Sequence, residues 1–254
     1  MNRDIPGPGQ RACLGSKRSR PSEVRMVLAA HQPHYLPWLG YFDKMDRADV
    51  FVVLDTVQFE KNGWQNRNKI KTSQGWQWLT VPVTYGFPAR IDQVWVNNRV
   101  RWGKKHWQAL ITNYRKAPYF DAYAPFFEET YQRSWEMLVD VNLHTIQFIK
   151  EMLGIQIELK IASRMEPTRE DPNGRLIDLC RQVGADTYLA GSGGRAYMDV
   201  EAFRRAGIRV VFQEYEHPVY PQLYGKFVPN LSVVDLLFNC GPESLSIIRG
   251  GRKG

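Results

Sequence analysis

The sequence has few cysteines and no long apolar run. Its three cysteines, Cys13, Cys180 and Cys240, lie far apart and form no CxxC pair. Such a sparse, odd set argues against a disulfide framework and is typical of a reducing compartment. No apolar stretch approaches the roughly 18–20 residues of a membrane span. The apolar run at residues 26–30 is too short for a signal-peptide core. We therefore expect a cytoplasmic protein without membrane insertion.

Positive charge is concentrated at the N-terminus. The net charge is +8, and the first 25 residues hold six Lys or Arg against two acidic residues, so half of the surplus lies there. The remaining surplus is mild and does not predict DNA binding. It suits an anionic substrate, an acidic carrier protein or a tRNA.

Composition also predicts the domain boundaries. Residues 1–25 are rich in Gly, Pro, Ser and Arg and have almost no large apolar residue, which predicts a disordered basic tail. The alternative is a functional basic arm. Met26 directly precedes the first structured segment and is a candidate start. We expect one domain at residues 26–243 and a flexible tail at 244–254.

Strand and helix patterns alternate at both ends of that domain. Apolar runs at 27–31, 50–55, 155–162, 187–190 and 208–213 predict strands, and 39–47, 175–183, 200–206 and 233–238 predict helices. Residues 65–71, 76–83 and 92–97 predict a hairpin-rich excursion, and 102–115 and 134–153 predict a helical insertion broken around Pro125. The fold class is therefore α/β, with a mostly parallel, Rossmann-like sheet flanked by helices. In such sheets the ligand crevice lies beyond the carboxyl ends of the strands.

The first polar cluster at a strand end is His31-Gln32-Pro33-His34-Tyr35. His31 is a candidate general base because an imidazole titrates near neutrality. A metal site is an alternative, but the run has no third ligand or metal spacing, so we expect no metal. The other alternative is that both imidazoles only hydrogen-bond to the backbone of a tight turn.

Asp55 and Gln58 follow the second strand, where Asp55 is either a turn cap or a substrate ligand. In the polar run 64–69, the planar guanidinium of Arg67 suits a carboxylate or a phosphate. Asn66 lies beside Arg67, whereas Lys69 and Lys71 fit a solvated hairpin face. For Asn66 and Asn68 the alternative of a solvated hairpin face is weaker.

The fourth cluster is the turn Gly191-Ser192-Gly193-Gly194-Arg195. Its glycines let backbone amides cradle an anion, although a plain turn explains the pattern as well. Three further candidates are Lys105-His106 at the head of a helix and His217 after the last strand. Many of the 8 Trp, 12 Tyr and 12 Phe residues lie beside polar residues, which suits a lined pocket.

Together these stretches resemble the WbqC-like protein family over residues 26–241. The resemblance is carried by HQP at 31–33, YLPWLGYF at 35–42, DTVQF at 55–59, QNRN at 65–68, WLTVPV at 78–83, KH at 105–106, KAPYF at 116–120, GAD at 184–186, GSGGR at 191–195, HP at 217–218 and LSVVDLLFN at 231–239. His34 departs from the family pattern, in which Asn is expected, and this leaves His31 as the better catalytic candidate.

The resemblance implies transfer of glycine or another acyl unit onto an aminosugar, in the biosynthesis of surface polysaccharide such as O-antigen or of natural products. The expected small-molecule substrate is a sugar or sugar nucleotide, and no cofactor is expected. The candidate catalytic residues are His31, Asp55 and His106. The candidate substrate-binding residues are Gln32, Tyr35, Gln58, Asn66, Arg67, Lys105, Ser192, Gly193, Gly194, Arg195 and His217.

Each role follows from the side chain. His31 would deprotonate the acceptor and Asp55 would orient it, while the amides of Gly193 and Gly194, with Ser192, would stabilise a tetrahedral oxyanion. Arg67, Lys105 and Arg195 would hold anionic groups. Two alternatives are a nucleotidyltransferase-like adenylating enzyme and a non-catalytic module that binds a sugar or a carrier.

Overall fold

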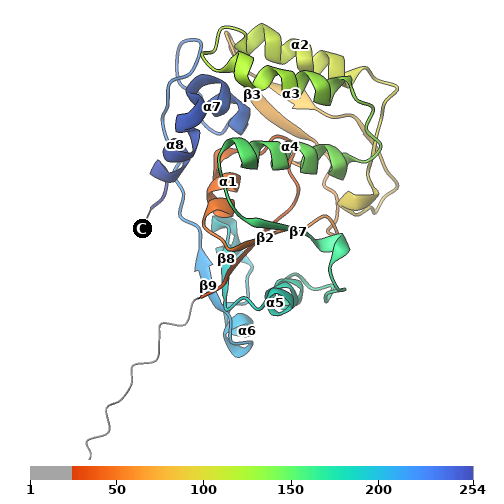
Figure 1. Ribbon diagram of the computed structural model, residues 1–254. Helices are drawn as coiled ribbons and strands as arrows, with labels where there is room; N and C mark the ends of the chain where they lie inside the picture. Colours follow the sequence, from red (N-terminus) through yellow and green to blue (C-terminus); the bar gives the residue numbers. More distant parts are fainter. Residues whose placement is uncertain (1–24, 254) are drawn as a thin grey trace, which may run out of the picture.

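A computed structural model describes residues 25–253 of the chain (Figure 1). The predicted N-terminal tail and Cys13 lie outside the described residues, except for Arg25. Five parallel strands form the central sheet: β1 (Val27–His31), β2 (Val50–Val53), β7 (Glu158–Ile161), β8 (Thr187–Ala190) and β9 (Arg209–Phe212). Their order is β7-β2-β1-β8-β9, and each neighbouring pair is parallel. The predicted α/β fold class is thereby confirmed.

Helices cover both faces of the sheet (Figure 1). Helices α1 (Leu39–Asp46), α4 (Leu138–Met152) and α7 (Val233–Cys240) pack on the face that carries Ala29 and Phe51. Helices α5 (Pro172–Val183) and α6 (Val200–Arg205) pack on the face that carries Leu28 and Val50. Successive strand residues point to opposite faces, so apolar runs without alternation are what a sheet covered on both sides requires.

An antiparallel excursion follows β2. Strands β3 (Arg67–Thr72) and β4 (Gly75–Thr80) form a hairpin, and the short β5 (Val83–Thr84) pairs with β6 (Trp95–Val96). Part of the strand expected at 92–97 is instead the 3-10 helix η1 (Ile91–Gln93). Lys71 is not on a solvated face: it is 1% exposed, and its ammonium donates to the backbone oxygen of Lys226 and to Gln222.

The helical insertion contains a helix that the sequence analysis missed. Helix α2 (Trp102–Tyr114) is followed by α3 (Phe120–Gln132), which continues through Pro125. Proline removes one helical hydrogen bond and is normally a breaker. Here the helix persists because Phe120, Tyr123, Phe127 and Tyr131 form one buried face. Tertiary packing of an amphipathic face outweighs local propensity.

The chain beyond residue 243 is also part of the fold. The 3-10 helix η4 (Gly241–Glu243) leads into α8 (Ser244–Gly250), where a flexible tail was expected. Arg252 forms ion pairs with Asp43 and Asp46 of α1, and Arg249 pairs with Asp46. Because Asp43 is completely buried, its carboxylate requires such a partner. In residues 25–253 no helix is long and apolar enough to cross a membrane.

Candidate functional site

The strand order creates a point where connections leave the sheet in opposite directions. β2 and β7 lie on one side of β1, whereas β8 and β9 lie on the other. Open α/β sheets bind ligands at such a switch point, beyond the carboxyl ends of the strands. Here a cavity of about 460 Å³ opens between the ends of β1 and β8. We call it the switch-point cavity; its polar and glycine lining comprises His31, Gln32, Lys44, Arg175, Gly191, Gly193 and Gly194.

His31 ends β1 and lines this cavity. Its Nδ1 is 3.1 Å from the backbone oxygen of Gln32, and its ring centroid is 4.5 Å from that of His34. Burial, followed by the charges of His34 and Lys44, holds the pKa of His31 well below its usual value. The imidazole is therefore neutral at neutral pH, which is the form that accepts a proton.

Lys44 is a second basic group in the cavity, and the sequence analysis did not select it. It lies in α1, is 3% exposed, and its Nζ donates to the backbone oxygen of Ala30 at 2.8 Å. Burial lowers the pKa of its amine to about 7. The sequence did contain a signal for the burial of Lys44. The surrounding helix is apolar around most of its circumference, so few of its positions can be exposed to solvent.

The turn after β8 supplies the cavity's glycine edge. The short 3-10 helix η3 (Ser192–Ala196) begins here, and Gly193 and Gly194 line the cavity. A Cβ on Gly194 would lie 2.9 Å from the sulfur of Met198, so this position favours glycine. The Gly194 amide already donates to the Gly191 oxygen, so its expected oxyanion role would require the turn to open. Ser192 is exposed and is not part of the cavity lining.

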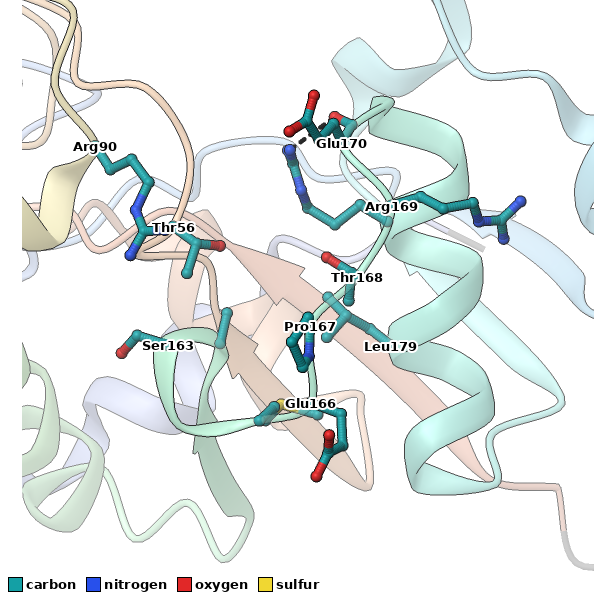
Figure 2. Close-up of a pocket in the computed structure, with 12 residues that line it drawn as sticks. Thr56, Arg90, Ser163, Glu166, Pro167, Thr168, Arg169, Glu170 and Leu179 are labelled. Carbon is teal, nitrogen blue, oxygen red and sulfur yellow. Dashed lines mark hydrogen bonds between the residues drawn. The ribbon is translucent and has the colours of Figure 1, made fainter.

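A second cavity, of about 510 Å³, lies beyond the ends of β2 and β7. Figure 2 shows Arg90, Thr56 and Ser163 on one side of it, across from the loop of Pro167 and Thr168. The 3-10 helix η2 (Ala162–Arg164) forms part of its wall.

Arg175 lines both cavities, and its guanidinium donates to the backbone oxygen of Glu170 at 2.8 Å. The two cavities thus share a cationic wall.

Asp55 has a positioning role in this structure. It is 1% exposed, and its carboxylate accepts hydrogen bonds from the backbone amide of Ser163 at 2.9 Å and from the Ser163 hydroxyl at 2.5 Å. This is the capping alternative of the sequence analysis. Asp55 therefore fixes the loop after β7 beside the second cavity but lines neither cavity.

His106 and Tyr35 lie together but away from both cavities. The hydroxyl of Tyr35 is 2.9 Å from Nδ1 of His106 and 2.7 Å from the hydroxyl of Tyr131. Nε2 of His106 is 3.1 Å from the backbone oxygen of Thr80, and burial lowers its pKa to about 4. This is a buried network that joins helices α2 and α3 to the hairpin. Neighbouring Lys105 is exposed.

The other predicted residues are dispersed. Gln58 forms an isolated bridge with Arg90, and the Asn66 side chain donates to the Val81 oxygen. Arg67 stacks on Trp78, with 4.2 Å between the guanidinium carbon and the ring centroid.

Two residues after β8 and β9 are also engaged elsewhere. Arg195 pairs with Glu214 at 2.5 Å and lies over Phe212. Nδ1 of His217 is 3.0 Å from the Pro218 oxygen. Of the candidates, the structure brings His31, Gln32, Gly193 and Gly194 together in one cavity, whose lining does not include Ser192.

Among the described residues, no group of three His, Cys, Asp or Glu side chains is placed to hold a metal ion.

Comparisons with known proteins agree with the resemblance noted in the sequence. The uncharacterized protein Rv1507c of Mycobacterium tuberculosis is 37% identical over 229 residues, which cover 87% of this chain and 97% of that protein. No solved structure matches the chain. The sequence profile of the WbqC-like protein family matches residues 32–247. The chain belongs to the WbqC-like protein family.

Proposed function

We propose that this protein is an acyltransferase that joins an activated acyl unit, such as glycine, to the amine or hydroxyl of an aminosugar. The observation that carries the proposal is the pairing of His31 and Lys44 in the switch-point cavity. Burial lowers the pKa of both groups, so at neutral pH His31 is a neutral imidazole and the amine of Lys44, with a pKa of about 7, is about half unprotonated. The implied role of the family in surface polysaccharide or natural-product biosynthesis supports this substrate class.

The step has a simple balance. The acceptor nitrogen or oxygen attacks the acyl carbon, a C–N or C–O bond forms, and the bond from the acyl carbon to its carrier breaks. The imidazole of His31 takes the proton from the acceptor, and the carrier leaves with the bonding electron pair. Lys44 is a second candidate for proton transfer, because an amine whose pKa lies near 7 can both accept and return a proton.

The donor would be anionic. A carrier protein, a tRNA and an adenylate all bear phosphate, and in the adenylate the phosphate is bonded directly to the transferred acyl group. Arg175 offers a guanidinium at the wall of the cavity, and guanidinium groups bind phosphate through paired hydrogen bonds. The turn 191–194 supplies backbone at the opposite edge.

A nucleotide-activating enzyme is the second candidate. The strand order and the switch-point cavity favour it, because this arrangement commonly binds nucleotides. Such an enzyme would join the substrate to AMP and release pyrophosphate from ATP. The acyltransferase proposal needs no pyrophosphate release during turnover.

The test incubates the purified protein with glycyl-tRNA, glycyl-adenylate or a glycyl carrier protein, together with an aminosugar. Mass spectrometry detects an acceptor that is heavier by one acyl unit. We expect His31→Ala to reduce the rate at least a hundredfold and Lys44→Met about tenfold.

The matched control is His144→Gln, because His144 lies in α4 and packs on Trp135, outside the cavity. Pyrophosphate release from ATP without product would favour the second candidate. If neither the acyl donors nor ATP react, the remaining interpretation is a non-catalytic binding module.

A further inference from the structure

His34 lines a different cavity from its neighbour His31. This cavity, of about 440 Å³, is lined by His34, Trp38, Trp64, Lys69 and Asn230, and we call it the tryptophan cavity. The two imidazoles are in T-shaped contact with 4.5 Å between their centroids. The tryptophan cavity and the switch-point cavity therefore adjoin at the His31–His34 pair.

Tryptophan side chains around this cavity are unusually exposed. Trp64 is 43% exposed and Trp76 is 46% exposed. Trp64 and Trp78 are 5.6 Å apart between centroids, and Trp76 and Trp78 are also 5.6 Å apart. Burial would have gained free energy for such large apolar rings. Exposed rings beside a cavity are consistent with a ligand that covers them.

The ammonium of Lys69 makes cation–π contacts with all three of these rings. Its ammonium is 4.4 Å from the centroid of Trp76, 5.1 Å from Trp78 and 6.0 Å from Trp64. Cation–π contacts hold the ammonium in place without neutralising its charge. In the part of the chain that the structure describes, Lys69 forms no salt bridge with an acidic side chain. A positive charge thus remains available at the cavity.

His34 adds a polar group to the wall. It is 9% exposed, and burial lowers its pKa to about 3, so the ring is neutral. A neutral imidazole offers one donor and one acceptor. Asn230 lies at the rim and offers a carboxamide with both donors and an acceptor.

We propose that the tryptophan cavity binds a pyranose ring that bears an anionic group. The apolar C–H face of the sugar stacks on Trp64, its carboxylate or phosphate pairs with Lys69, and its hydroxyls bond to His34 and Asn230. The inference rests on the proposed function only in making this sugar the acceptor. In that arrangement the reactive group of the acceptor meets the donor where the two cavities adjoin, beside His31.

The experiment measures binding to the full chain without any donor. Saturation-transfer NMR and tryptophan fluorescence titrations compare glucuronate, glucose 6-phosphate, glucose, acetate and inorganic phosphate. We expect both anionic sugars to bind more tightly than glucose, and the tighter of the two identifies the anionic group. Acetate or phosphate binding as tightly as the sugars would refute recognition of the ring.

Three variants separate the contacts. Trp64→Ala should weaken binding of the anionic sugars at least tenfold, and Trp64→Phe should retain it because an aromatic face remains. Lys69→Gln should reduce the affinity for glucuronate to that for glucose. The matched control is Trp95→Ala: Trp95 is 51% exposed on β6 and does not line this cavity, so binding should be unchanged.

Three further results would overturn the proposal. They are full sugar binding by Trp64→Ala, an unchanged preference for anionic sugars in Lys69→Gln, and loss of sugar binding in Lys44→Met while Trp64→Ala still binds the sugar. The last result would put the sugar in the switch-point cavity. Because the assay needs no turnover, a protein that binds the sugar but transfers nothing refutes the acyltransferase proposal alone.

Discussion

Replacing Lys44 by methionine tests whether burial brings the pKa of this amine close to neutral pH. The side chain is 3% exposed, and its one hydrogen bond, to the Ala30 oxygen, does not neutralise a charge. Methionine has a similar length and no charge, so Lys44→Met keeps most of the packing. The variant removes the titration and little else.

The sign follows from the two pKa values. Burial lowers the pKa of Lys44 from 10.5 to about 7 in the folded protein. Between these values the unfolded chain binds the additional proton, so stability rises with pH. One pKa unit corresponds to about 1.4 kcal/mol. Integrated from about pH 6 to about pH 9, deprotonation of Lys44 raises the free energy of unfolding by roughly 2–3 kcal/mol, because the cost of the buried charge is relieved.

Urea denaturation of the wild type and of Lys44→Met across this pH range measures the effect. Other groups titrate in both proteins and cancel in the difference. We expect the stability of the variant to rise by roughly 2–3 kcal/mol relative to the wild type as the pH falls from about 9 to about 6. Lys105→Met, at an exposed position on α2, should follow the wild-type profile. Parallel profiles for wild type and Lys44→Met would refute the reasoning.

Three further variants test other contacts. Asp55→Asn should lower the free energy of unfolding by about 1–3 kcal/mol in urea denaturation, because it loses charge-assisted hydrogen bonds to the loop after β7. Unchanged stability would contradict the role of Asp55 in fixing this loop. Gly194→Ala should weaken donor binding in calorimetry because its Cβ meets a methionine sulfur, whereas Gly250→Ala has open space on α8, does not line the cavity and serves as control. Arg252→Ala should cost about 2 kcal/mol and lower the melting temperature, since it leaves the buried Asp43 short of a partner; an unaltered melting curve would exclude that role.

Local pattern was sufficient for the sheet. The apolar runs that became β1 and β8 were predicted at their observed bounds, because strands buried on both faces show continuous apolar sequence. It was insufficient where packing overruled a local signal. Pro125 was taken as a break, yet the face formed by Phe120 and Phe127 holds α3 together. Helix α8 was missed because its ion pairs with α1 join residues about 200 positions apart.

The site was predicted only where residues follow parallel strands. His31 and Gly193 meet because the carboxyl ends of β1 and β8 share one edge, which the fold class implies. The positions of Lys44 and His106, in contrast, could not be predicted from the local sequence. A lysine within a helix is usually solvated and a histidine at a helix head is usually accessible, but both are buried by partners distant in sequence.

The central position of β1 bears on how the chain is made. β1 carries His31 and leaves the ribosome well before β8, yet one of its edges pairs with β8, where Val27 meets Thr187. At about 5–20 residues per second, synthesis of the intervening segment takes on the order of ten to thirty seconds. During that time an apolar strand edge has no partner of its own, a condition that favours aggregation. Assembly of the switch-point cavity thus requires that the unpaired edge of the nascent β1 strand is protected from aggregation. Slow translation or a missing chaperone should therefore reduce the yield of folded protein before any effect on catalysis is seen.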